Sequence, residues 1–366
     1  MLAAGPQFRT HVIADDLRGG YQVVAADLNR DGKPDLIALA SGMTELVWFE
    51  NPGWERHVLA SGLKAPINLA ATDLDGDGIP EIILGSDFAM DPRKSAGTVF
   101  VLKCAGDPRA PWSIKEIDRL PATHRLRWAN IDGKGKVAVD APLAGAAAVP
   151  PDYRAAVPLV YYRAGSWKRE LIADSLEGVL HGIYINDFDG DGRDEVLTAS
   201  FVGIHLFKLG PDGKWGRTKL AKGSPEPWPR CGASEIAVGH LGERRFLCSI
   251  EPWHGNEVVV YFETAGKWIR RVIDNSMVDG HALLVADLDG DGRDEIVAGY
   301  RGQGKSVNVY RAADTTGTTW TRAPLDAGGM GAASCAVADL NGDGKPDLAC
   351  IDDHQLKWYE NVRGSE

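Results

Sequence analysis

The sequence has little of several features that would assign the protein to a familiar class. No apolar run approaches the roughly 18 residues that a membrane-spanning helix needs, so no membrane span is expected. No run of Lys and Arg is present either, and 51 acidic residues against 40 basic ones give a net charge of -11. Such a chain would be repelled by a phosphate backbone, so nucleic acid is not an expected partner.

Cysteine is also scarce, and the N-terminal residues do not have the pattern of a signal peptide. The five cysteines are odd in number and mostly lie in apolar runs, which favours free buried thiols over a disulfide framework. They are Cys104, Cys231, Cys248, Cys335 and Cys350. The start "MLAAGPQFRT" lacks a charged segment followed by an apolar one. The protein is thus expected to be periplasmic or secreted if a signal peptide was removed and cytoplasmic otherwise; nothing indicates its oligomeric state.

An acidic segment repeats along the whole chain. Its complete copies read "AADLNRDGKPDLIAL", "ATDLDGDGIPEIILG", "INDFDGDGRDEVLTA", "VADLDGDGRDEIVAG" and "VADLNGDGKPDLACI". Two degenerate copies, "WANIDGKGKVAVDAP" and "AVGHLGERRFLCSIE", fill the gaps at the right interval. Repetition at this spacing is typical of arrays and propellers.

A second repeat, an aromatic residue followed four residues later by an aliphatic one, lies between the acidic copies. Six members begin at Trp54, Trp112, Trp167, Trp215, Trp268 and Trp320. The seventh, "FRTHVIA" at Phe8, precedes the first acidic copy. With one further alternating run per unit, each unit reads as four short strands.

Seven four-stranded units predict an all-β fold, a seven-bladed β-propeller, as a single domain over residues 1–366. The strand at residues 7–14 is expected to complete the last blade and close the ring. The expected blades cover residues 20–60, 64–118, 122–173, 178–221, 231–274, 278–326 and 330–362.

The acidic turns have the pattern of a calcium loop. Carboxylates at alternate positions of a tight turn converge their oxygens, and a hard divalent cation removes their repulsion. An EF-hand is excluded because the flanks alternate as strands do and the closing acid comes at position 9 rather than 12. The expected structural calcium ligands are Asp27, Asn29, Asp31 and Asp35; Asp73, Asp75, Asp77 and Glu81; Asp187, Asp189, Asp191 and Glu195; Asp287, Asp289, Asp291 and Glu295; and Asp339, Asn341, Asp343 and Asp347. In the third unit Lys134 replaces the third acid, and its ammonium is expected to stand in for the ion.

These copies resemble the FG-GAP/VCBS repeat, the calcium-loop unit also found in integrin-type propellers. The resemblance covers nearly the whole chain and implies the same fold and the same ion.

Histidines recur at one register ahead of the turns. His281 lies six residues before Asp287, and the same count gives His181 and His124 in two other units. In a propeller this position lies at the channel mouth opposite the turns. The "EPWHG" loop should bring His254 to the same face, and the "GYRGQGK" loop should bring Tyr300 and Arg301.

Three interpretations of the histidines remain open. They could bind a transition metal such as zinc, act as a general base beside anion-binding arginines, or simply hydrogen-bond neighbouring backbone. Nearby Trp128, Trp228 and Trp253 favour a sugar ligand. Two insertions, from Ser86 and from Ala141, extend loops on this face and are expected to act as lids, the second with Tyr153 and Arg154.

Calcium-type blades, channel histidines and the "EPWHG" segment together resemble the propellers of aldos-2-ulose dehydratase and of rhamnose-glucuronate polysaccharide lyases. The resemblance implies a carbohydrate-active lyase or dehydratase that performs β-elimination. The register of the histidines and the loops on the same face, rather than the resemblance, give the catalytic candidates His281, His181, His254, His124, Arg301 and Tyr300. The alternative is a non-catalytic, calcium-stabilised propeller that binds glycan or protein, because one fold hosts both.

Overall fold

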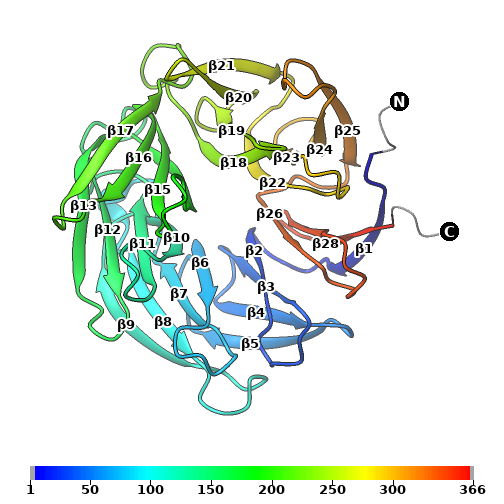
Figure 1. Ribbon diagram of the computed structural model, residues 1–366. Coiled ribbons are helices and arrows are strands. Elements are labelled where there is room, and N and C mark those ends of the chain that lie inside the picture. Colours follow the sequence, from blue (N-terminus) through cyan, green and yellow to red (C-terminus); the bar gives the residue numbers. More distant parts are fainter. Residues whose placement is uncertain (1–4, 363–366) are drawn as a thin grey trace.

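The structure is a computed structural model, in which residues 5–362 are described. The described chain forms 28 strands and one short 3-10 helix, η1 (Pro92–Lys94), and the strands make seven separate four-stranded antiparallel sheets. The sheets are arranged as blades around a central channel, with the first strand of each blade innermost (Figure 1). The all-β, seven-bladed prediction is confirmed.

The strand bounds of each blade are as follows. Blade 1 comprises β2 (Gly20–Ala26), β3 (Asp35–Ala40), β4 (Glu45–Glu50) and β5 (Glu55–Ser61); blade 2 comprises β6 (Asn68–Thr72), β7 (Glu81–Ser86), β8 (Thr98–Lys103) and β9 (Ser113–Arg119); blade 3 comprises β10 (Thr123–Ala129), β11 (Val137–Pro142), β12 (Ala156–Arg163) and β13 (Arg169–Glu177); blade 4 comprises β14 (Leu180–Asn186), β15 (Glu195–Ser200), β16 (Gly203–Leu209) and β17 (Trp215–Ala221). Blade 5 comprises β18 (Glu235–Leu241), β19 (Arg244–Glu251), β20 (Glu257–Thr264) and β21 (Lys267–Asp274); blade 6 comprises β22 (Gly280–Ala286), β23 (Glu295–Tyr300), β24 (Ser306–Ala312) and β25 (Trp320–Ala327); blade 7 comprises β26 (Ser334–Ala338), β27 (Asp347–Ile351), β28 (Leu356–Asn361) and β1 (Phe8–Ala14).

The two chain ends close the ring within blade 7. Strand β1 pairs antiparallel with β28, from Phe8 opposite Asn361 to Ala14 opposite Leu356. The outermost strand of the last blade therefore comes from the N-terminus, as the displaced Phe8 copy predicts. The expected domain also includes residues 1–4 and 363–366, which lie outside the described residues.

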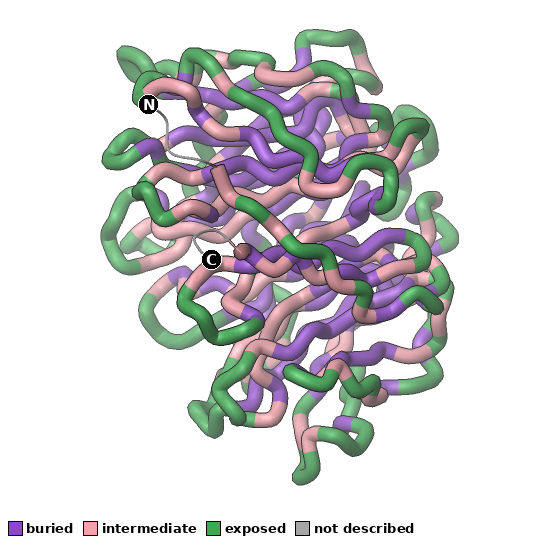
Figure 2. The backbone as a smooth tube through the Cα atoms, turned by 90° about the vertical axis from the view of Figure 1, so that its right-hand side faces the viewer, coloured by how far each residue is buried: buried purple, intermediate pink, exposed green. Residues whose placement is uncertain are grey.

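The hydrophobic core consists of seven clusters in and between the blades and an eighth beside the insertions. The aromatic residue that begins each outer strand packs against a different one of the first seven: Trp112, Trp215, Trp320, Trp54, Trp268, Phe8 and Trp167. The second and third strands of the blades are mainly buried, whereas the outer strands and the connecting turns are largely exposed (Figure 2). The second repeat therefore serves packing.

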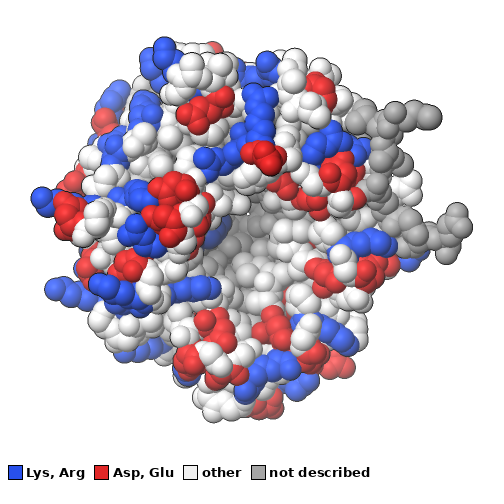
Figure 3. Space-filling model, viewed as in Figure 1, with Lys and Arg blue, Asp and Glu red and all other residues white. Residues whose placement is uncertain are grey.

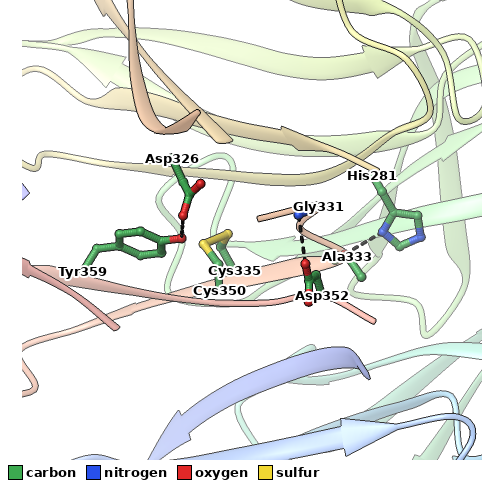
Figure 4. The surroundings of a disulfide bond; sticks show 8 residues. All are labelled: His281, Asp326, Gly331, Ala333, Cys335, Cys350, Asp352 and Tyr359. Atoms are coloured by element: carbon green, nitrogen blue, oxygen red, sulfur yellow. Dashed lines mark hydrogen bonds between the residues drawn. A yellow bond between two sulfur atoms is a disulfide. The ribbon is translucent and has the colours of Figure 1, made fainter. Parts of the chain in front are cut away.

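The cysteine prediction was wrong for one pair. Cys335 on β26 lies directly opposite Cys350 on β27, and the two form a disulfide (Figure 4). The sequence places these cysteines 15 residues apart, and only the strand register brings them face to face. Cys104, Cys231 and Cys248 are free thiols, as expected.

Within residues 5–362, no helix is long and apolar enough to cross a membrane. On the face of the ring drawn in Figure 3, acidic and basic side chains lie next to one another around a hollow centre.

Candidate functional site at the channel mouth

Four polar side chains reach the channel from equivalent positions in four different blades. Tyr21, His124, His181 and His281 are each the second residue of an innermost strand, and the strand pairing skips each of them as a bulge. A bulge leaves one residue unpaired and re-aims its side chain. The repeated bulge thus turns four side chains from four blades toward the same part of the channel.

A fifth side chain arrives from a loop. His254 lies between β19 and β20, in the left-handed conformation with φ 48. The loop is anchored by buried Glu251, which accepts hydrogen bonds from Tyr261 and from Arg270 Nε, the latter at 2.8 Å. A side chain at Gly255 would collide with the Glu251 carbonyl oxygen at 2.2 Å, so the tight loop requires glycine there.

Three of the imidazoles converge. Nitrogen atoms of His181, His254 and His281 lie within 4.8 Å of one another, and the ring centroids are 4.9 to 5.1 Å apart. His181 Nε2 lies 3.2 Å from His254 Nε2. The structure therefore brings together these three predicted histidines, and His124 follows with its ring 4.9 Å from that of His181.

The opposite ring nitrogen of each of the three has its own partner. Nδ1 of His281 lies 2.5 Å from the Ala333 carbonyl oxygen (Figure 4), Nδ1 of His181 lies 2.8 Å from Glu235, and Nδ1 of His254 lies 3.2 Å from Asp279. In His281 and His181 the oxygen accepts a hydrogen bond, so Nδ1 is the protonated nitrogen and Nε2 carries a lone pair. This is how proteins commonly orient histidines that bind a metal.

Three residues at the site, Tyr21, Glu235 and Asp279, were not predicted as members. The Tyr21 hydroxyl lies 3.0 Å from His124 Nε2 and 3.3 Å from His281 Nε2. Glu235 anchors His181 and also accepts a hydrogen bond of 2.8 Å from Arg125. Tyr21 stands six residues before Asp27, so the register that identified the histidines could have identified it; nothing in the sequence marked Glu235.

Arginines surround the histidines. Arg125 Nη2 lies 3.3 Å from His181 Nε2, and Arg125 Nη1 reaches both His124 and the Tyr21 hydroxyl. Arg301 pairs with Asp279 and lies 3.3 Å from His254 Nδ1. Tyr300 does not join the site, because its hydroxyl donates to the Gly304 carbonyl oxygen of its own loop.

The electrostatics keep the histidines neutral. Burial, reinforced by the positive charge of Arg125, holds the pKa of His124 and His181 well below the usual value; for His281 the causes are burial and Arg301. Burial also lowers the pKa of His254, against the opposing effect of Asp279. Burial acts to raise the pKa of Asp279, but hydrogen bonds from His254 and Arg301 bring it to about 2. The site is thus a set of neutral bases beside permanent cations.

A cavity of about 600 Å³ opens next to His254, lined by Trp253, Phe201, Pro229 and Asp279, among others. Its volume is that of a small-ligand site. A narrower space of about 80 Å³, bordered by Tyr21, Arg125 and His281, continues into the channel and has room for a few waters.

The two insertions pack together beside the histidines. Tyr153 is buried, its ring lies edge-on to Trp253, and its hydroxyl donates to the carbonyl oxygen of Met90 in the other insertion. Phe88 lies 5.4 Å from the His124 ring. Tyr153 therefore builds the wall of the site.

The other predicted aromatic and basic residues have mainly structural partners. Trp228 donates a hydrogen bond to the Asp152 carbonyl oxygen, and the Arg154 guanidinium lies 4.2 Å from the centre of its ring. Trp128 donates a hydrogen bond to the Ala70 carbonyl oxygen and lines a different cavity from the one next to His254.

The acidic turns fall into two kinds when tested for a fit to calcium. In blades 2, 4 and 6 the carboxylates of three acids converge to within 4.8 Å, and a basic side chain reaches the same oxygens. In blade 1, no ion pair of Asp27, Asp31 or Asp35 occurs in the part of the chain that is described, and burial together with Asp31 and Asp27 raises the pKa of Asp35 to about 6. The oxygen donors of blade 1 suit a hard cation, whereas those of blades 2, 4 and 6 are paired with a lysine or arginine side chain.

Blade 3 differs from its prediction. Asp132 pairs at 2.7 Å with Arg163 from the third strand, whereas Lys134, expected to replace the ion, only donates its backbone amide to Asp132.

Comparisons with known proteins agree with this architecture. The FG-GAP-like repeat model matches residues 27–84 and 287–350, and the model of the aldos-2-ulose dehydratase β-propeller domain matches residues 96–264. Aldos-2-ulose dehydratase of Phanerodontia chrysosporium is 27% identical over 308 residues, which are 74% of this chain and 33% of that protein. The chain thus spans a third of the length of this relative.

Solved structures share the fold at low identity. An N-acetylglucosamine-recognising lectin of Agrocybe aegerita has a TM-score of 0.57 at 15% identity, covering 92% of this chain and 87% of that one. A protein assigned as a 6-phosphogluconolactonase from Bacteroides uniformis has a TM-score of 0.53 at 12% identity, covering 91% and 89%. The chain is a seven-bladed β-propeller in which residues 27–84 and 287–350 match FG-GAP-like repeats and residues 96–264 are similar to the β-propeller domain of aldos-2-ulose dehydratase.

Proposed function

We propose that the protein is a carbohydrate-acting lyase that performs β-elimination at the channel mouth, releasing water from a keto-sugar or a sugar from a uronate glycoside. The observation that carries the proposal is the convergence of three neutral imidazoles, each held by its Nδ1, beside two arginines. The similarity to aldos-2-ulose dehydratase supports the reaction class.

The reaction needs a base, a stabiliser for the enolate and a proton for the leaving group. The lone pair on Nε2 of His281 or His181 would take the proton α to the carbonyl, and the C–H electron pair would move into the enolate. Arg125 and Arg301 would stabilise the enolate oxygen. As the enolate collapses, the C=C bond forms and the β C–O bond breaks, and the Tyr21 hydroxyl would donate the proton that the departing oxygen takes up.

His181, His254 and His281 also fit a transition metal such as zinc, because three oriented imidazoles leave further positions for substrate. A metal bound there would supply Lewis-acid polarisation of the substrate carbonyl. The residues then left to move protons are Tyr21 and His124. Arg125, which reaches the same Nε2 of His181, would have to withdraw.

The test is turnover of aldos-2-uloses and of uronate-containing oligosaccharides, followed by the ultraviolet absorbance of the conjugated product. His281→Ala and His181→Ala should each lower kcat by about 10²–10⁴-fold while circular dichroism stays unchanged. His240→Ala, a half-exposed histidine at the end of β18, serves as control. Elemental analysis of the same samples separates the two versions, since a bound transition metal should be lost from both channel variants.

Absence of turnover on every keto-sugar and uronate tried, with glycan binding retained, would contradict the proposal. The protein would then be a non-catalytic propeller that binds glycan in the cavity beside Trp253.

A further inference from the structure

The third strand of each blade brings one side chain to the acidic turn. In blade 2, Leu102 pairs with Ile82, so the next residue, Lys103, lies beside Glu81. The same register places Lys208 beside Glu195 in blade 4 and Arg311 beside Glu295 in blade 6. Three turns therefore receive a basic side chain from the same structural position.

Each basic side chain contacts several of the expected calcium ligands. Lys103 Nζ forms an ion pair with Asp75 and another, at 2.8 Å, with Glu81. Lys208 Nζ forms an ion pair with Asp189 and lies 2.8 Å from Asp191 and 3.1 Å from Glu195. An ammonium is a compact charge with three donors, so it fills the space between converging carboxylates.

Arg311 makes the corresponding contacts in blade 6. Its Nη2 lies 2.6 Å from Asp289 and 2.9 Å from Asp291, and its Nε lies 3.5 Å from Glu295. Asp289 and Glu295 are almost fully buried. The guanidinium therefore lies within the cluster of acids rather than on its outer surface.

Blades 1 and 7 have the opposite charge at this position. Glu50 and Glu360 occupy it. The second ligand position changes with it: these two turns carry Asn29 and Asn341, whereas the three turns with a basic residue carry aspartate. An extra negative charge in the turn thus accompanies the basic side chain, which is the pattern expected if one compensates the other.

We infer that Lys103, Lys208 and Arg311 are built-in cations that replace calcium in the turns of blades 2, 4 and 6. Calcium coordinates oxygens at about 2.3–2.6 Å and would need the space that the basic group fills. Its entry would break the charge-assisted hydrogen bonds and bring two cations together. The turns of blades 1 and 7, where glutamate stands at the third-strand position, remain as the calcium candidates; in blade 7, Lys345 of the turn itself lies 3.2 Å from Asp343.

The experiment is calcium binding to the metal-stripped full-length protein by isothermal titration calorimetry and equilibrium dialysis. Wild type should bind at most two calcium ions. Lys103→Gln and Lys208→Gln should each gain one, and their melting temperature should rise on adding calcium by more than that of wild type.

Two controls make the result specific. Lys208→Arg keeps the positive charge and should keep the wild-type stoichiometry. Lys214→Gln, in the same blade but paired only with exposed Asp212, should gain no ion. Three or more calcium ions in wild type would overturn the inference even if every variant failed to fold. Folded Lys103→Gln and Lys208→Gln proteins that gain no calcium would overturn it as well.

Discussion

The acidic turns and the channel mouth place charged groups in opposite ways. Each turn takes its acids from nine consecutive residues, is repeated around the ring and is mostly exposed. The channel site takes one or two residues from each of several blades, occurs once and is buried. A turn is thus a local property of the chain, whereas the channel site exists only when the ring is closed.

The largest expected effect comes from breaking a buried contact of the channel site. Arg125→Met would leave Glu235 without its guanidinium partner, in a pair whose side chains are 5% and 14% exposed. Removing one member of a buried ion pair costs about 3–5 kcal/mol, so the urea midpoint should fall strongly. The double variant Arg125→Met/Glu235→Gln should recover part of the loss; no recovery would mean that the pair is not coupled.

The disulfide should have the next largest effect. It closes a segment of 15 residues, for which chain entropy gives about 3 kcal/mol. The Cys335→Ala/Cys350→Ala variant should lose about this much stability. Ala333, whose carbonyl oxygen bonds to His281 Nδ1, directly precedes the strand that carries Cys335. The variant therefore also tests whether the disulfide helps to hold His281 in position. A reductant should then have no further effect, because the other three cysteines are free thiols; a further loss would point to another disulfide.

A single turn should matter less than the ion pair. Glu195 is buried, accepts a hydrogen bond of 2.7 Å from the Phe188 backbone amide and pairs with Lys208. Glu195→Ala should cost about 1.5–3 kcal/mol, the range for hydrogen bonds to charged groups. The exposed Glu263 of blade 5 is the matched control, and chemical denaturation is the measurement. A loss no greater than that of Glu263→Ala would show that the turn does not hold its blade.

The smallest expected effect is the change of the free energy of unfolding with pH, and its sign should be opposite in the acidic turns and in the channel site. The pKa of His281 is lower folded than unfolded, so the stability it contributes is present above about pH 6.5 and is lost as pH falls. Burial and Asp289 raise the pKa of Glu295 to about 8, so its contribution is full below about pH 4.5 and is lost as pH rises to 8.

The free energy of unfolding should be measured against pH for wild type, His281→Gln and Glu295→Gln. The difference between wild type and each variant isolates the contribution of the one group that was replaced. Between about pH 4.5 and 6.5 the two differences should slope in opposite directions, each by at most about 1.4 kcal/mol per pH unit. The measurements should be made with a chelator present. Parallel slopes would mean that the two regions do not differ in this way.

The sequence alone was sufficient for much of the molecule. Alternating apolar residues, turns and the displaced Phe8 strand predicted seven four-stranded blades and their closure, because strand periodicity and turn chemistry act over a few residues. The common register of His124, His181 and His281 likewise predicted that they face one channel, since equivalent positions of equivalent blades lie at equal depth.

The remaining features depend on contacts between distant residues. Cys335 and Cys350 meet through strand register, and Lys103 reaches its turn from a strand that begins 17 residues after Glu81. Glu235 and Arg125 are 110 residues apart, and Tyr21 and His281 are 260 apart. Repeat patterns fix the position of a side chain within its own blade, but the partner of that side chain is set by how neighbouring blades pack. The sequence by itself therefore determined the propeller and its acidic turns, while only the tertiary structure decided which nitrogen of His181 and His281 is free and which turns are paired with a basic side chain.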